Sequence, residues 1–355
     1  MKILHTSDIH IDSPLTARLS RDKIKERRAE LLANLSRLAA ECRRVGAPVM
    51  IIAGDLFDSD NVSQRAKRAF YDIIQEYSDI HFVVLPGNHD SEILSTEGFI
   101  DAPNLHVFEK DTLTTFALGD VTFTGMWPNK PGMFDELELD AAQKNIVILH
   151  GELRDKTGDD GESIGTRDIV GRNIDYVALG HYHAYRATEL DKRTTAVYSG
   201  TPEGRGFDEC GECGYVVIDT DGEGVTHRFE KIAKRNMRII PVSLDNVERP
   251  YDVIERTEAA LSGIPCSDLI RIELCGSYPP GFWKDTAQIC DRFKDRFYHF
   301  EVKDSSHISV NPADYKYDKT LKGEFIRLVD SDDTLDEETK RRVIECGVFA
   351  LMGEE

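Results

Sequence analysis

The sequence predicts an α/β fold in which short parallel strands alternate with helices. Apolar runs rich in β-branched residues alternate with helical stretches through residues 1–100, a pattern typical of a parallel sheet with helices packed on it. The expected strands are 2–5, 48–53 and 81–85, and the expected helices are 21–45 and 62–77. Each of these strands ends in a block of polar residues, and the strand pattern begins afresh near residue 236.

The elements that follow predict a second, more antiparallel half of the same core. Gly119-Asp120 suits a two-residue turn and predicts a hairpin between 112–118 and 121–125. Further strands are expected at 145–150, 175–180, 194–199, 214–219 and 225–230. Two sheets of this kind would make a two-layered core.

A smaller α+β unit is expected over residues 236–312. Its predicted strands are 239–244, 269–274 and 297–302, and its predicted helices are 251–261 and 286–293. Two more helices are expected at about 318–329 and 335–352, and Thr334-Leu-Asp-Glu337 reads as a capping box that opens the second.

Apolar stripes on the two terminal helices suggest a binding face. Leu321, Phe325 and Leu328 form the first stripe, and Ile344, Val348 and Leu351 form the second. Exposed apolar stripes usually mark an interaction surface. The alternative is that the helices pack on each other or back on the core.

The charge balance neither demands nor excludes a nucleic-acid substrate. The chain of 355 residues has a net charge of −20, so no global basic field draws it to DNA. Two bound divalent ions would add four positive charges locally. Residues 16–45 carry nine Lys and Arg against four Asp and Glu, for which a solvated helix face is the favoured interpretation.

The cysteines and the hydropathy pattern favour a cytoplasmic protein. Seven cysteines without framework spacing indicate a reducing compartment. The only C-x-x-C, Cys210 to Cys213, has no second pair, so a zinc or redox role is not favoured. The N-terminus does not read as a signal peptide, and no apolar run is long enough to span a membrane.

Five polar blocks hold nearly every residue needed to bind two metal ions. Five of the 11 histidines fall inside them, and each block comes at the end of an apolar run. The blocks are Asp8-Ile9-His10, Gly54-Asp55, Gly87-Asn88-His89-Asp90, His150-Gly151 and Gly180-His181-Tyr182-His183. Open α/β sheets bind ligands at the carboxyl ends of their strands, so these side chains should gather at one edge.

Imidazole, carboxylate and amide ligands form a mixed site suited to Mn, Fe, Zn or Ni. Asp55 could bridge two cations because its carboxylate has two oxygens, and Asn88 supplies a neutral oxygen. Two ions about 3.5–4 Å apart can clamp a phosphate and generate a nucleophile at neutral pH. His89 follows Asn88 and suits the role of general acid on the leaving oxygen, or of stabilising charge on the phosphate.

The ordered set D-x-H, G-D, G-N-H-D, H-G and G-H-x-H resembles the calcineurin-like metallophosphoesterase superfamily. The opening Lys2 to His10, Ala53 to Asp58 and Pro86 to Asp90 are more similar to its SbcD-type DNA repair exonuclease branch. The loop Tyr198 to Phe207 resembles the Y-x-G-[ST]-P-E loop of that branch. The tail, with Leu321 to Ile326 and Ala350 to Gly353, resembles a bacterial YhaO-like subgroup.

This resemblance implies a four-layer α/β/β/α sandwich over residues 1–235, a capping domain that contacts DNA over 236–312, and a partner-docking segment over 313–355. It assigns one metal to Asp8, His10, Asp55 and His183, and the other to Asp55, Asn88, His150 and His181. His89 would be the catalytic histidine. Manganese would be preferred, with Fe, Zn, Ni or Mg as alternatives.

The resemblance also implies a manganese-dependent nuclease that degrades DNA ends 3′ to 5′ and can nick single strands. Members of this branch are typically homodimers that work with an SbcC-type ATPase. The terminal helices match in position the segment that docks on that ATPase.

Several residues beside the blocks allow two interpretations. Asp12, Asp58 and Asp90 could orient the ligands or cap the helices that follow their strands. Arg205 could contact phosphate or lie in a surface turn. Trp127 and Trp283 could stack on bases, although core or interface packing is the safer expectation.

Three functions compete. The leading hypothesis is a DNA nuclease, and the second is a small-molecule phosphodiesterase or phosphatase on the same scaffold. The long extension after the core favours the nuclease, whereas the acidic balance keeps the phosphatase open. The third is an interaction subunit with a structural metal site, against which His89 argues because such a site needs no acid.

Overall fold

The computed structural model describes residues 1–355 except 16, 18, 60–61, 90–101, 136 and 353–355. The chain divides into two compact units, Met1–Asn236 and Met237–Glu355. Each unit has its own hydrophobic core.

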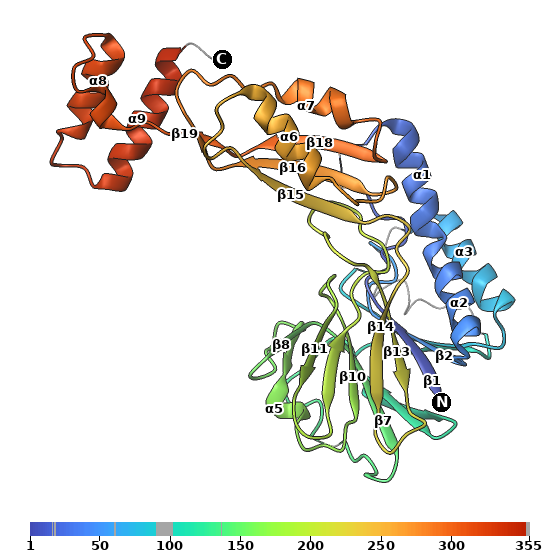
Figure 1. The fold of residues 1–355 in the computed structure, drawn as a ribbon. Coiled ribbons are helices and arrows are strands. Elements are labelled where there is room, and N and C mark those ends of the chain that lie inside the picture. The colour runs from blue at the N-terminus through green and yellow to red at the C-terminus, as the bar shows by residue number, and fades with distance from the viewer. Residues whose placement is uncertain (16, 18, 60–61, 90–101, 136, 353–355) are drawn as a thin grey trace. The chain divides into compact units, whose positions relative to one another are not determined.

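Two six-stranded sheets form the first unit (Figure 1). The first has the order β14-β13-β1-β2-β3-β4, and the second has the order β11-β12-β10-β7-β6-β5. The strands of the first sheet are β1 (Lys2–Thr6), β2 (Val49–Ala53), β3 (His81–Leu85), β4 (Leu105–Val107), β13 (Gly214–Asp219) and β14 (Thr226–Lys231). The strands of the second are β5 (Thr114–Leu118), β6 (Val121–Gly125), β7 (Lys144–His150), β10 (Tyr176–Gly180), β11 (Arg186–Glu189) and β12 (Thr195–Tyr198). A short ladder joins β8 (Glu152–Arg154) to β9 (Ser163–Gly165).

Parallel strands occupy the centre of both sheets. Strands β1 to β4 run parallel in the first sheet, and β6, β7, β10 and β12 run parallel in the second. Antiparallel strands add to the margins, including the predicted hairpin of β5 and β6. Because parallel neighbours end at the same edge, the loops after β1, β2 and β3 emerge together, and so do those after β7 and β10.

The two sheets pack face to face around a shared apolar core. Ile51 and Val83 from the first sheet belong to the same cluster as Phe123, Ile146 and Ala178 from the second. On the other side of the first sheet lie α2 (Asn34–Val45) and α3 (Gln64–Glu76), and α1 (Arg21–Leu32) leads end to end into α2 (Figure 1). On the outer face of the second sheet, the described residues form only one short helix, α5 (Thr166–Ile169), together with loops. The predicted fold class is confirmed, and its fourth layer consists of α5 and the loops on the outer face of the second sheet.

The single helix expected over 21–45 is wrong, because Ala33 separates α1 from α2. Helix α2 packs on the sheet through apolar residues such as Leu35 and Leu38. Helix α1 instead buries charge, since the Arg27 Nη1 atom donates to Glu203 Oε1 at 2.8 Å and to Glu30 Oε2 at 2.6 Å. Two helices with such different packing partners need not share one axis.

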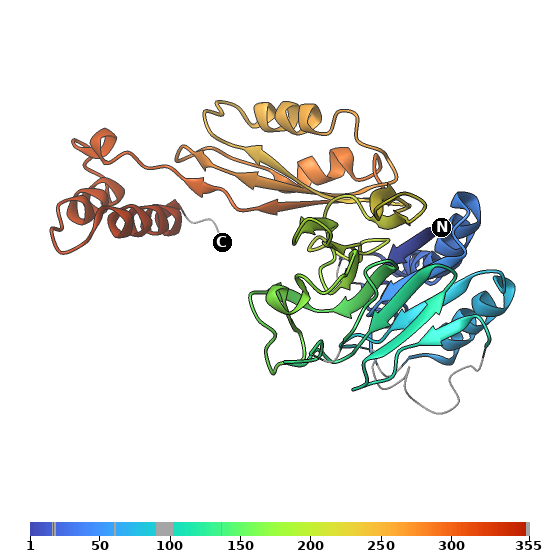
Figure 2. The ribbon, with the colours of Figure 1, turned by 90° about the horizontal axis from the view of Figure 1, so that it is seen from below.

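The second unit is built on a three-stranded parallel sheet in the order β15-β16-β18. Its elements are β15 (Met237–Ser243), α6 (Pro250–Ala260), β16 (Leu269–Cys275), β17 (Ser277–Tyr278), α7 (Thr286–Phe293), β18 (His299–Asp304), β19 (His307–Ile308) and the 3₁₀ helix η1 (Pro312–Tyr315). Figures 1 and 2 place α6 and α7 on the same face of this sheet, as two right-handed crossovers in one direction require.

Helices α8 (Leu321–Asp330) and α9 (Glu337–Met352) complete the second unit. Ile326, Val329, Ile344 and Val348 form a small core between them. The proposed capping box at Thr334 is wrong, because Asp336 caps α9 by accepting a hydrogen bond from the Thr339 backbone N–H at 2.8 Å. Within the described ranges of the chain, no helix combines the length and the apolar character needed to cross a bilayer.

Candidate metal centre

The five polar blocks meet at the carboxyl edge of the two sheets. They follow or end the parallel strands β1, β2 and β3 of the first sheet and β7 and β10 of the second. The backbone is strained there, with φ values of 50° at Asp8, 47° at His10, 52° at Asp55 and 104° at His181. Side chains other than glycine rarely adopt such angles, and they concentrate at functional sites.

Asp8, His10 and His183 form one cluster of ligand atoms. The two Nε2 atoms of His10 and His183 are 3.4 Å apart, and His183 Nε2 lies 3.9 Å from Asp8 Oδ1. His10 Nε2 also lies 3.6 Å from Asp55 Oδ2. Ligand atoms at about 2.0–2.2 Å from one ion stand roughly 3–4 Å from each other, so this spacing suits a single cation.

A second cluster joins Asp8, Asp55 and His150. The His150 Nδ1–H donates to the Ala53 carbonyl at 3.0 Å, which leaves the lone pair on Nε2. That Nε2 atom is buried without a hydrogen-bond partner and lies 3.5 Å from Asp55 Oδ2. The Asn88 Oδ1 atom is also buried and unpartnered, while its Nδ2 donates to Glu162.

His181 completes the set through both its backbone and its ring. Its backbone N–H donates to Asp8 Oδ1 at 3.0 Å, and its ring stands edge-on to that of His150 with centroids 5.6 Å apart. Thus all seven predicted ligands lie in the two clusters or next to them. The seven are Asp8, His10, Asp55, Asn88, His150, His181 and His183.

These residues fit two divalent cations that share Asp55. Buried polar atoms without partners are costly, and the orphaned atoms of His150 and Asn88 are both acceptors that a cation would satisfy. The buried carboxylates of Asp8 and Asp55 repel each other unless positive charge lies between them. Asp55 Oδ2 lies within 3.6 Å of a histidine of each cluster, as a bridging ligand requires.

Two acidic residues lie behind the ligand histidines. His10 Nδ1 faces Asp58 Oδ1 at 3.1 Å, and His183 Nδ1 faces Glu209 Oε1 at 2.7 Å. The hydrogen bond to Glu209 fixes the tautomer of His183 and leaves its Nε2 lone pair for the metal, whereas Asp58 lies near His10 Nδ1 without a hydrogen bond. Asp58 was expected among such residues, whereas Glu209 was missed because no motif marks it and its distance from His183 in sequence hides the contact.

Arg205 holds Asp58 and Glu209 in place through hydrogen bonds. Its guanidinium donates to Glu209 Oε1 from Nε at 2.9 Å, and from Nη1 to Asp58 Oδ1 at 2.8 Å and Ser13 Oγ at 3.1 Å. The side chain is only 13% exposed, so the surface-turn interpretation is wrong. Because protein acceptors already occupy its donors, its geometry suits positioning Asp58 and Glu209 better than holding phosphate.

The pKa values follow from these contacts. Burial alone would raise the pKa of Glu209, but hydrogen bonds from His183 and Arg205 outweigh it and lower the pKa to about 2. Burial would lower the pKa of His183, but its hydrogen bond to Glu209 and the nearby Asp8 charge raise it instead. Glu209 therefore stays ionised throughout the neutral range.

We expect Glu209→Gln to weaken metal binding about 10–100-fold, because removing the partner of a ligand histidine loosens the ligand. The glutamine keeps the size but loses the charge that holds Arg205 and His183. The folded-state pKa of Glu209 is depressed, so its contribution to stability is present above pH 4.5 and lost as the pH falls toward 2.

Calorimetric metal titration and urea unfolding across this acid range check both effects. The variant should lose less stability than the wild type between pH 4.5 and 2. Glu212→Gln, an exposed acidic residue paired with Lys231, is the matched control. Unchanged metal affinity in Glu209→Gln would show that His183 needs no such partner.

The other residues that the sequence placed near the site have different outcomes. Asp12 Oδ2 accepts a hydrogen bond from the Ser63 backbone N–H at 3.0 Å, just before α3. The helix that follows β1 is capped by Ser20, so the expectation that Asp12 caps it is wrong. Asp90 lies outside the described residues. Trp127 packs in the core, with its ring edge-on to that of His150, whereas Trp283 is exposed.

His89 lies at the exposed edge of the candidate metal centre, and its Nε2 atom is available to a substrate. Its backbone N–H donates to Asp55 Oδ1 at 3.2 Å, and its Nδ1 lies 2.9 Å from the Asp58 carbonyl oxygen. A carbonyl only accepts, so Nδ1 carries the proton and donates it. Nε2 then lies 4.0 Å from Asp55 Oδ2 on a side chain that is 51% exposed. His89 is thus next to both clusters and open to a substrate.

Two glycines let the blocks approach each other. A Cβ on Gly54 would collide with the His150 ring, and a Cβ on Gly87 would collide with the Asp55 carboxylate. Gly54 also has φ of 87°. The glycines beside Asp55 and Asn88 are therefore steric requirements of the site.

The sequence pattern of the calcineurin-like phosphoesterases matches residues 1–185, which is more than half of the chain. The chain belongs to the calcineurin-like phosphoesterase family. This membership confirms the resemblance drawn from the five blocks. The family uses a dinuclear metal centre, and the Asp and His clusters are the candidate site for it.

Relatives of this phosphoesterase include DNA repair proteins at low identity. The "DNA double-strand break repair protein Mre11" of Methanosarcina acetivorans is 25% identical over 266 residues, covering 72% of this chain and 42% of that protein. The SbcD component of the SbcCD nuclease of Escherichia coli K12 is 26% identical over 282 residues, covering 65% of this chain and 68% of that protein. The chain therefore spans less than half of the length of the first of these relatives.

Two solved structures align with part of the chain. A dimetal phosphatase from Danio rerio is 9% identical with a TM-score of 0.43, covering 65% of this chain and 96% of that one. The protein TT1561 of Thermus thermophilus is 16% identical with a TM-score of 0.42, covering 64% of this chain and 98% of that one.

Proposed function

We propose that this phosphoesterase is a metal-dependent DNA nuclease that hydrolyses phosphodiester bonds at the Asp55 centre. The observation that carries the chemistry is the pair of buried, unpartnered acceptors His150 Nε2 and Asn88 Oδ1, the first of which lies 3.5 Å from Asp55 Oδ2. The names of its relatives and the second unit support DNA as the substrate.

The ligand roles are those that the family resemblance implies. Asp8, His10, Asp55 and His183 would hold one ion, and Asp55, Asn88, His150 and His181 would hold the other. When bound, such a pair supplies Lewis acidity to the phosphate and activates water for attack.

His89 would serve as the general acid. Its Nδ1 proton is committed to the Asp58 carbonyl, so Nε2 is the atom that can bring a second proton. When water attacks phosphorus and the ester P–O bond breaks, His89 Nε2–H donates that proton to the leaving oxygen. The Asp58 backbone carbonyl fixes the His89 ring, and the Asp58 carboxylate lies near His10.

Manganese is the metal we expect to support the highest activity, and 3′ to 5′ degradation from DNA ends is the polarity we expect. A nuclease assay on end-labelled duplexes with Mn²⁺, Mg²⁺, Zn²⁺ or chelator tests this, with a chromogenic phosphodiester beside it. Shortening of the duplex from its 3′ ends in Mn²⁺ supports the proposal.

The competing candidate is a small-molecule phosphodiesterase, which the net charge of −20 favours. It would hydrolyse the chromogenic ester and leave every DNA substrate intact. That result would contradict the nuclease assignment while retaining the metal centre.

We also propose that α8 and α9 dock an SbcC-like ATPase. Leu321 and Leu328 of α8 are 73% and 71% exposed, while the core between the helices uses other residues. A shallow apolar groove beside them is lined by Phe325, Val343 and Gly347. An exposed apolar surface on a helix pair suits a partner helix.

We expect Leu321→Ser/Leu328→Ser to abolish ATPase binding in pull-down and calorimetry while retaining Mn-dependent cleavage of short oligonucleotides. The exposed leucines contribute nothing to the α8–α9 core, so the variant should stay folded. Lys316→Ser/Lys319→Ser, in the polar segment before α8, is the control. Undiminished binding by the double leucine variant would place the docking surface elsewhere.

The second unit is proposed to cap the nuclease domain and contact DNA, and the chain is proposed to form a homodimer. Sedimentation at several concentrations tests the dimer. A monomer at every concentration would contradict it.

A further inference from the structure

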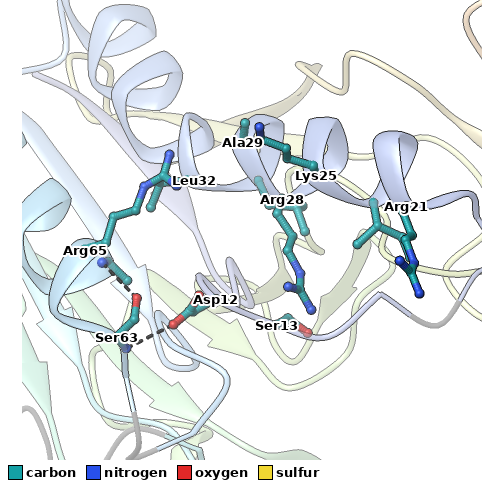
Figure 3. Close-up of a pocket in the computed structure, with 12 residues that line it drawn as sticks. Asp12, Ser13, Arg21, Lys25, Arg28, Ala29, Leu32, Ser63 and Arg65 are labelled. Carbon is teal, nitrogen blue, oxygen red and sulfur yellow. Dashed lines mark hydrogen bonds between the residues drawn. The ribbon is translucent and has the colours of Figure 1, made fainter.

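A basic pocket opens in the first unit (Figure 3). It has a volume of about 400 Å³ and lies between α1, the loop after β1 and the start of α3. Arg21, Lys25 and Arg28 line it from α1, and Arg65 lines it from α3. In Figure 3, Arg28 points from α1 toward Ser13, and Arg65 faces the same helix.

These four cations have no acidic partner among the residues that the structure describes. Neighbouring basic residues differ: Arg27 pairs with Glu203 at 2.8 Å, and Arg43 pairs with Asp79 at 2.5 Å. Among the described residues that line the pocket, Asp12 is the one acidic residue, and its Oδ2 already accepts a hydrogen bond from the Ser63 backbone N–H. In a chain of net charge −20, four unpaired cations around one pocket call for an anionic ligand.

The spacing on α1 strengthens this argument. Arg21, Lys25 and Arg28 follow one another by four and three residues, so they share a face of the helix. Like charges at such spacing destabilise an isolated helix. A solvated face would gain from interspersed acids, whereas a row of cations fits the repeated charges of a phosphate backbone.

The pocket connects to the metal centre through Ser13. Ser13 lines the pocket, and its Oγ accepts a hydrogen bond from Arg205 Nη1 at 3.1 Å. The same Nη1 donates to Asp58, whose carboxylate faces the ligand His10. The lining of the pocket is therefore linked by two hydrogen bonds to the carboxylate that faces His10.

We propose that Arg21, Lys25, Arg28 and Arg65 bind backbone phosphates of the polynucleotide strand that flanks the scissile bond. This inference rests on the proposed nuclease function and specifies its substrate as an extended polyanion. The contacts reach phosphates and no base edges, so the binding should be independent of sequence.

The test compares two variants that each remove three positive charges. The pocket variant is Arg21→Gln/Lys25→Gln/Arg28→Gln. The control is Lys2→Gln/Lys144→Gln/Lys192→Gln, which lie at the amino ends of β1 and β7 and in the turn before β12, at the sheet edge opposite the metals. Both variants have the same net charge, so the long-range field changes equally.

Fluorescence anisotropy of a labelled single-stranded oligonucleotide, in chelator to prevent cleavage, gives the Kd across a salt series. The pocket variant should bind roughly 10–100-fold more weakly than the control, and its slope of log K against log salt should fall by about 2, near 0.7 for each lost phosphate contact. Circular dichroism and metal content check that each variant is folded.

Equal Kd and equal slope in the two variants would overturn the proposal and leave a solvated helix face. Cleavage is measured separately on wild-type protein. Wild type that binds the strand through the pocket but cuts no DNA would contradict the nuclease function alone. A smaller slope of log K against log salt in the pocket variant alone supports phosphate binding in the pocket, whether or not the wild type cleaves DNA.

Discussion

Asp55→Ala is expected to remove both metal ions and to lower phosphodiester hydrolysis by more than about 10³-fold. Asp55 Oδ2 lies 3.6 Å from His10 Nε2 and 3.5 Å from His150 Nε2, so the substitution removes a ligand from each ion at once. No other ligand among the described residues lies so close to a histidine of both clusters. Metal content after dialysis, measured beside turnover of the chromogenic ester, checks this.

Asp120→Ala is the matched control, because Asp120 is exposed in the β5–β6 turn. It should retain both ions. Two tightly bound ions in Asp55→Ala would show that the carboxylate does not bridge, and the ligand sets would have to be redrawn.

His89→Ala should lower hydrolysis about 10²–10⁴-fold, the usual cost of losing a general acid, and leave both metals bound. His89 Nδ1 is held by the Asp58 carbonyl, and its side chain is 51% exposed, so it can turn Nε2 toward a substrate. A substrate with a good leaving group needs less protonation, so the loss should be smaller on a nitrophenyl ester than on DNA.

His307→Ala, an exposed histidine of the second unit, is the control for this variant. The metal content of the His89→Ala protein, measured beside its activity, shows whether His89 acts as an acid or as a ligand. An inactive and metal-free His89→Ala protein would make His89 a ligand instead of an acid.

The sequence was informative wherever chemistry and strand pattern coincide. Asp8, Asp55 and His150 each follow or end an apolar run, and parallel strands bring such ends together. That local rule was enough to predict the fold class and the residues of both clusters. It also separated them from His5, which lies in the core with its Nδ1 2.9 Å from the Tyr176 hydroxyl.

The apolar pattern of the sequence failed to predict features that depend on contacts between charged residues far apart in the sequence. Ala33 separates α2, which packs on the sheet, from α1, whose Arg27 is buried against Glu203, 176 residues away in the sequence. Glu209 behind His183 was missed for the same reason. Apolar periodicity reports burial of hydrocarbon, so it cannot reveal an acid that is buried against arginine and histidine.

The most direct test of the dinuclear nuclease is a Mn²⁺ titration in which bound metal and cleavage of end-labelled duplex DNA are followed in the same samples. The arrangement around Asp55 predicts two bound equivalents per chain, with cleavage rising as the second equivalent binds. Saturation at one equivalent with full cleavage, or two bound ions without any cleavage of DNA, would contradict the account.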